Sequence, residues 1–135
     1  MAVHELKPKD SEKITINLGP VDLGQIDLLV QEGFYSNRTD LIRTAIRNQL
    51  AQHADVVRQT VARKSLVLGM QHYSRADLEA VQAAGQRLQI QVLGLASIAA
   101  DVPAELALAT IESITVLGAL HASAPVRAAL AGRIR

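Results

Sequence analysis

Strict alternation of apolar and polar residues marks the first patterned segment of the chain, residues 13–18. Successive side chains of a β-strand point to opposite faces, so this alternation predicts a half-buried strand. β-Branched residues, which favour strands, occupy several of these positions. The apolar face holds Ile14, Ile16 and Leu18, and the polar face holds Lys13, Thr15 and Asn17.

A helix of about three turns is predicted directly after this segment. Pro20 suits the first helical position, and Leu23, Ile26 and Leu29 recur at helical spacing. Gly33 then supplies the left-handed residue that ends many helices.

A second and longer helix is predicted from Arg38. Either Ser36 or Asn37 can cap its N-terminus, and Asp40 completes a capping box if Asn37 is the cap. The apolar stripe of this helix continues at steps of four and seven residues. Its members are Ile42, Ile46, Leu50, Val57 and Val61.

A single strand cannot satisfy its backbone hydrogen bonds or bury its apolar face alone. Pairing with the same strand of a second copy solves both problems, so we expect a homodimer that forms as the chain folds. Two such strands make an antiparallel ribbon, which fits the major groove of DNA. The expected dimer core consists of Ile14, Ile16, Leu18, Ile42 and Ile46.

These residues resemble the ribbon-helix-helix family of DNA-binding proteins, of the MetJ, Arc and CopG type. The resemblance rests on Lys-Ile-Thr-Ile-Asn-Leu at residues 13–18, on the short helix that ends at Gly33, and on residues 35–43. It implies an intertwined dimer, here over residues 13–64, that binds a double-stranded operator. The implied base contacts are Lys13, Thr15 and Asn17, and the implied phosphate contacts are Ser36, Asn37 and Arg38.

Each of these roles has a simpler alternative. The polar strand residues could form an ordinary solvated face, and the residues before the second helix could serve only as its cap. The two roles of the cap are compatible, because a capped helix still has free amides for an anion.

The second half of the chain, residues 65–135, contains a repeat. Val-Leu-Gly occurs at residues 67–69, 92–94 and 116–118, and each glycine is expected to end a short strand. A capping residue and a helix are expected after each strand. The caps are Ser74, with Asp77 as its capping-box partner, Asp101 and Ser123. Three strand-helix units of this length are typical of a small β/α repeat.

Polar residues alternate with apolar ones in the second and third of these strands. One face of the sheet is therefore expected to be polar, with the helices on the other face. This favours a solenoid-like repeat over a doubly wound sheet, whose strands are apolar on both faces. The whole chain is thus predicted to be an α+β protein.

Two roles are open for this repeat domain, oligomerisation and effector binding. Its sheet edges could pair between subunits and build a tetramer or larger assembly. The residues His72, Ser97 and His121 follow the three glycines at equal distance, where parallel sheets bind ligands. Stacked strands would hold the two histidines on the order of 10 Å apart, too far to share one metal ion.

Composition narrows the function classes. The 14 basic and 13 acidic residues give a net charge of +1, so the prediction of DNA binding rests on the motif and not on charge. The chain has no cysteine, which excludes disulfides and thiolate sites and is typical of the cytoplasm. Residues 1–12 are expected to form a flexible polar arm, and no apolar run is long enough for a membrane.

No catalytic or cofactor-binding motif occurs, so neither an enzyme nor a metal site is expected. The sequence predicts a sequence-specific transcriptional regulator, a repressor that reads the major groove. The alternative is an antitoxin-type or scaffold protein whose C-terminal domain binds a protein partner. Antitoxin tails tend to be disordered until bound, whereas the second half of this chain is patterned to fold.

Overall fold

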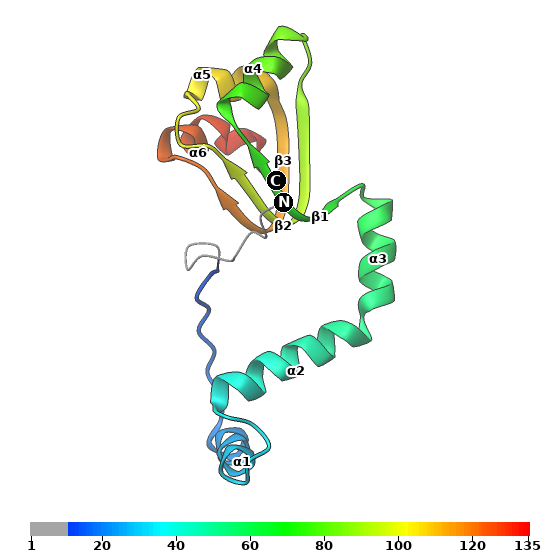
Figure 1. Cartoon of the computed structure of the whole chain (residues 1–135), viewed down its shortest axis with the longest axis vertical. Coiled ribbons are helices and arrows are strands. Elements are labelled where there is room, and N and C mark those ends of the chain that lie inside the picture. The colour runs from blue at the N-terminus through cyan, green and yellow to red at the C-terminus, as the bar shows by residue number, and fades with distance from the viewer. Residues whose placement is uncertain (1–10) are drawn as a thin grey trace. The chain divides into compact units, whose positions relative to one another are not determined.

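The computed structural model describes residues 11–135, so most of the expected arm lies outside the described residues. The described part is an α+β fold with six α-helices, a short 3-10 helix and a three-stranded sheet (Figure 1). The chain divides into two compact units, Lys13–Thr60 and a second that contains residues 61–135. The α-helices are α1 (Pro20–Gln31), α2 (Arg38–Gln52), α3 (Ala54–Arg63), α4 (Arg75–Ala83), α5 (Ala104–Thr110) and α6 (Ala124–Leu130). The strands are β1 (Val67–Tyr73), β2 (Leu88–Ile98) and β3 (Ile111–His121), and the 3-10 helix is Ala131–Arg133.

Residues 13–18 do not form a strand within the single chain. They are not helical, and the one sheet of the described part does not include them. Their apolar side chains are open to solvent, Ile14 at 75% and Ile16 at 59% exposure. A strand is defined by hydrogen bonds to a neighbouring strand, and one chain supplies none here. The expected strand is wrong for the isolated chain, and the ribbon stays a prediction about the dimer.

The end of α1 confirms the predicted glycine stop. Gly33 has a φ of 86°, in the left-handed region. The amide of Phe34 donates to the carbonyl oxygen of Leu29 at 3.0 Å, and that of Gly33 donates to Val30 at 3.1 Å. These two bonds form a Schellman motif, which ends the helix and satisfies its last carbonyl groups.

The second helix is shorter than its apolar stripe predicts, because it is interrupted at His53. This residue has φ −103° and ψ 11°, and its amide donates to the carbonyl oxygen of Leu50 at 3.1 Å. The helix restarts at Ala54 as α3. A stripe of apolar residues defines a face but does not require unbroken backbone bonds between its members, so the expected single helix is wrong.

The sheet register reproduces the sequence repeat residue by residue. The strands are parallel and lie in the order β1-β2-β3, and each Val-Leu-Gly triplet pairs with the same triplet on the next strand. The strands do not end at Gly69, Gly94 and Gly118 but continue for three or four residues, which corrects the expected strand ends. Each glycine has a positive φ, between 123° and 137°, a conformation that side chains with a Cβ rarely adopt.

Two of the three predicted caps are confirmed. Ser74 and Asp77 form a full capping box at α4, and the Ser123 hydroxyl accepts from Val126 N at α6. The expected cap Asp101 is wrong, because α5 begins after Pro103 and has no side-chain cap bond.

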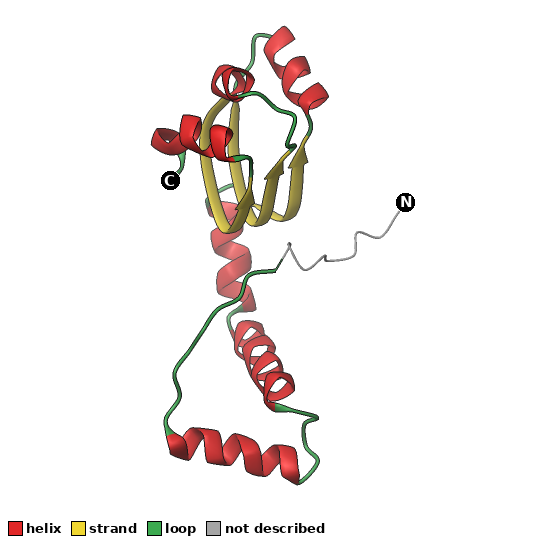
Figure 2. Cartoon of the chain, turned by 90° about the vertical axis from the view of Figure 1, so that its left-hand side faces the viewer, coloured by secondary structure: helices red, strands yellow, loops and turns green. Residues whose placement is uncertain are grey.

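Helices α4, α5 and α6 pack on one face of the sheet (Figure 2). Buried leucines from the three helices meet buried residues of the strands in one continuous core. The helix residues include Leu78, Leu106 and Leu130, and the strand residues include Ile90, Val92 and Ile114. The second unit therefore contains its own core.

The opposite face of the sheet, here called the open face, is only partly polar. In β2 the buried residues alternate with less buried ones, and the register carries this alternation to β1 and β3. Gln89, Gln91 and Thr115 occupy the beginning of the open face, as expected, but Leu68 and Leu117 follow, at 66% and 54% exposure. The expected polar face is therefore wrong for the middle of the strands, between Gln91 and Ser97 of β2 and in register with them on β1 and β3. The open face consists of Leu68, Met70, His72, Gln89, Gln91, Leu93, Leu95, Ser97, Ser113, Thr115, Leu117, Ala119 and His121.

We expect Gly94→Ala to destabilise the second unit by more than about 2 kcal/mol. A Cβ at Gly94 would overlap the carbonyl oxygen of Gly69, and the φ of 137° strains any side chain. Gly132→Ala is the control, because its Cβ would meet no heavy atom within 4 Å. Chemical denaturation measures the free energy of unfolding of both variants. Equal losses in the two variants would contradict the structural role of the glycine column.

Candidate nucleic-acid interface

The three predicted base-contacting residues lie together on the segment that precedes α1. Lys13, Thr15 and Asn17 are all exposed, and they alternate with the exposed Ile14 and Ile16. Lysine donates hydrogen bonds, while threonine and asparagine side chains both donate and accept. Such a set can bind base edges if the segment is held as a strand.

The N-terminus of α2 has the cap that the sequence predicts. The Asn37 side chain accepts from Asp40 N at 2.8 Å, which identifies Asn37 as the cap. The Asp40 carboxylate accepts in turn from the backbone and hydroxyl of Ser36, at 3.0 and 3.1 Å. The reciprocal bond thus goes to the residue before the cap, so the capping box expected for an Asn37 cap is wrong. These hydrogen bonds lower the pKa of the Asp40 carboxyl.

Arg38 is held by an acidic residue that the sequence reasoning missed. Its Nε and Nη2 atoms donate to the two carboxylate oxygens of Asp27, both at 2.8 Å. This bidentate pair lowers the pKa of the Asp27 carboxyl and raises that of the Arg38 guanidinium. Asp27 lies in α1, eleven residues away, so no local pattern around α2 points to it.

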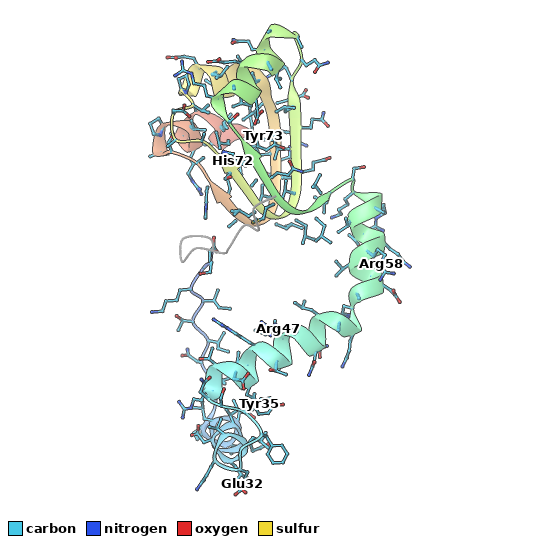
Figure 3. All side chains as sticks on the ribbon, in the orientation of Figure 1. Glu32, Tyr35, Arg47, Arg58, His72 and Tyr73 are labelled. Atoms are coloured by element: carbon cyan, nitrogen blue, oxygen red, sulfur yellow. The ribbon has the colours of Figure 1, made fainter. Side chains whose placement is uncertain are left out.

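The first amides of α2 remain available to an external acceptor. The first backbone bond at this end runs from Leu41 N to Asn37 O at 3.3 Å, so the amides of Arg38 and Thr39 precede it. A phosphate oxygen could bind there, aided by the helix dipole. Further along the helix Arg43 and Arg47 are exposed, and Figure 3 shows Arg47 projecting from α2.

No side chain is buried anywhere in residues 13–60, all of which the structure describes. The expected dimer-core residues are exposed or half-buried in the single chain. They are Ile14, Ile16, Leu18, Ile42 and Ile46. A segment of this length without a core lacks the apolar burial that stabilises a domain. These apolar side chains are therefore available to a second copy.

The sheet brings His72, Ser97 and His121 into one row, as their spacing predicts. His72 Nδ1 and Ser97 Oγ lie 2.7 Å apart, within hydrogen-bond distance. The row lines an open hollow of about 1000 Å³ at the carboxyl ends of the strands, together with Arg127 and apolar residues. Within residues 11–135 no group of three His, Asp or Glu side chains is placed to hold a metal ion.

In an Arg38→Gln variant we expect the pKa of Asp27 to rise toward its usual value near 4, while the pKa values of Asp40 and Asp77 stay low. A carboxyl whose pKa is lower in the folded than in the unfolded state stabilises the protein at pH values above its unfolded-state pKa. This contribution is lost as the pH falls through the folded value. Carbon-detected NMR titration of the carboxyl groups measures the three values. An unchanged Asp27 titration would contradict the ion pair.

Comparison with known proteins identifies the family of this chain. No curated protein and no solved structure matches the chain. No helix of the described residues is long and apolar enough to cross a membrane. A sequence model of the ribbon-helix-helix transcriptional regulator family matches residues 9–127. The match extends beyond the N-terminal motif and through most of the sheet unit. The chain therefore belongs to the ribbon-helix-helix transcriptional regulator family.

Proposed function

We propose that the chain is a repressor that binds a specific double-stranded operator as a homodimer, in the cytoplasm. Residues 13–18 of two copies pair as an antiparallel ribbon and enter the major groove. One observation carries this proposal: residues 13–60 contain no buried side chain, while their apolar residues alternate with polar ones at the ribbon.

The dimer supplies the core that the single chain lacks. Burying an isoleucine or leucine side chain contributes about 1.5–3 kcal/mol, and the ribbon provides Ile14, Ile16 and Leu18 twice. The opposite face then presents Lys13, Thr15 and Asn17 in two copies related by a twofold axis. A symmetric reading surface of this kind fits a palindromic site.

Phosphates on either side of the groove would bind at the start of α2. Ser36 and Asn37 shape this end, and the amides of Arg38 and Thr39, which precede the first backbone bond of the helix, would donate to the phosphate. The ion pair with Asp27 uses Nε and Nη2 of Arg38, and the guanidinium has further donors on Nη1. Asp27 thus orients the Arg38 side chain without engaging all of its hydrogen-bond donors.

The second unit would join dimers into a tetramer or larger assembly. Its β3 edge is partly covered by the chain itself, since Ile134 bridges to Ile114 and Arg135 N donates to Ile114 O at 2.8 Å. The edge of β1 has no such cover among the described residues.

Two other roles stay open for this unit: binding an effector in the hollow, and binding a protein partner as an antitoxin or scaffold would. Its own buried core distinguishes it from a tail that folds only on its partner, and so favours the regulator.

Replacing Lys13, Thr15 and Asn17 together by alanine should abolish sequence discrimination and leave the dimer intact. The three side chains would read bases, whereas dimerisation uses the apolar face. A site is first selected from a pool of random duplexes, and fluorescence anisotropy then compares it with scrambled DNA. Retained sequence discrimination would refute base reading by these three residues. A separate variant, Ile16→Lys, tests the ribbon, because it should yield monomers.

Arg38→Ala should weaken binding to all duplexes alike and reduce the salt slope of log K by about one for each phosphate that the variant no longer binds. Arg58→Ala in α3 is the matched control, because Arg58 is also exposed and paired, with Asp55 at 3.1 Å. The measurement is anisotropy at several salt concentrations. The phosphate role is wrong if both variants change equally, or if only the selected site is affected.

A further inference from the structure

The apolar rows of the open face carry no charged residue, and the carboxylate of Glu112, beside the first polar row, accepts a hydrogen bond from Gln89 at 3.0 Å. The thirteen positions of this face are apolar, amide, hydroxyl or histidine side chains, although the chain has 27 residues of the types Asp, Glu, Lys and Arg (14 basic and 13 acidic). An exposed surface normally carries charged residues among its apolar ones. Their absence from the centre of a sheet face indicates a surface that is covered in the assembled protein.

Apolar side chains form two neighbouring rows across this face. Leu68, Leu93 and Leu117 pair in register in the first row, and Met70 pairs with Leu95 in the second. Leu68, Met70 and Leu117 are exposed in the single chain, and Leu93 and Leu95 are half-buried. The apolar band lies between polar rows, so it has the form of an interface centre with a polar rim.

The parallel arrangement of the strands also indicates that the open face is covered in the assembled protein. Sheets made only of parallel strands occur almost exclusively with both faces covered. Here β1, β2 and β3 are all parallel, and α4, α5 and α6 pack on one face alone. Within residues 61–135 the open face is thus the uncovered half of an architecture that normally has two layers of cover.

We propose that the open face packs against the open face of a second copy of this chain. A twofold axis between two such sheets brings the leucine row of one onto the leucine row of the other, with Leu93 nearest the centre. Neither apolar band carries a fixed charge that would repel its copy. A charged partner would find no complementary group in this band, which favours the second copy over an acidic or basic protein.

The size of the face fits association between copies that are already linked. Three strands of 7, 11 and 11 residues, spaced about 4.8 Å apart, cover on the order of 500 Å². A stable independent interface needs about 800 Å² on each partner. The ribbon compensates for the difference, because chains held in pairs meet at a raised effective concentration. The inference therefore rests on the proposed ribbon dimer.

The absence of cysteine permits a direct test on the full chain. In a Leu93→Cys variant, a short bismaleimide linker should join two copies, because packed sheets lie about 10 Å apart. Val67→Cys is the matched control. Val67 lies on the edge strand β1, is exposed, and belongs to the opposite face in register with Val92. Denaturing gels measure the joined species, and circular dichroism verifies that each variant is folded.

Cross-linking of Leu93→Cys but not of Val67→Cys, and its loss when Leu68→Lys and Leu117→Lys are added, would support the face-to-face contact. Absent cross-linking at position 93, equal cross-linking at both positions, or cross-linking that survives the two lysines would overturn it. Solution mass separates the two proposals. A dimeric chain without the cross-link overturns only this inference, whereas a monomeric chain overturns the ribbon dimer as well.

Discussion

The stability of residues 13–60 depends on apolar side chains that this segment cannot bury alone. Ile14 and Ile16 are open to solvent, and neither α1 nor α2 contains a buried residue. The hydrophobic effect requires another surface for these side chains, and the alternating segment offers one to an identical segment. In such an arrangement dimerisation and folding are one process. The polar residues that would read DNA come into register only as a result of it.

The second unit has the opposite character. Its helices and strands share a continuous core within one chain, and its capping box at Ser74 defines α4 locally. The column of Gly69, Gly94 and Gly118 lets three strands keep the same register while adopting a positive φ at each step. A self-contained fold of this kind can position two DNA-binding halves without depending on them for its stability.

The electrostatics at the start of α2 restrict how a phosphate could bind. The Asp27 carboxylate accepts hydrogen bonds from one side of the Arg38 guanidinium, and the Asp40 carboxylate accepts from Ser36. Each carboxylate is engaged, so the positive end of the helix and the remaining guanidinium donors are the groups left for an anion. Affinity there would come from fixed donors more than from net charge, in agreement with the chain's near-neutral total of +1.

Local sequence determined the features that depend on neighbouring residues. These include the stop at Gly33, the cap at Asn37 and the three strand-helix units, because glycine conformation, capping bonds and side-chain periodicity act within a few residues. The family and its DNA-binding motif were also readable from residues 13–50, since they rest on one contiguous pattern. Only the tertiary structure decided the Asp27–Arg38 pair, the break at His53 and the apolar open face. Each of these depends on contacts or backbone geometry that side-chain periodicity does not encode.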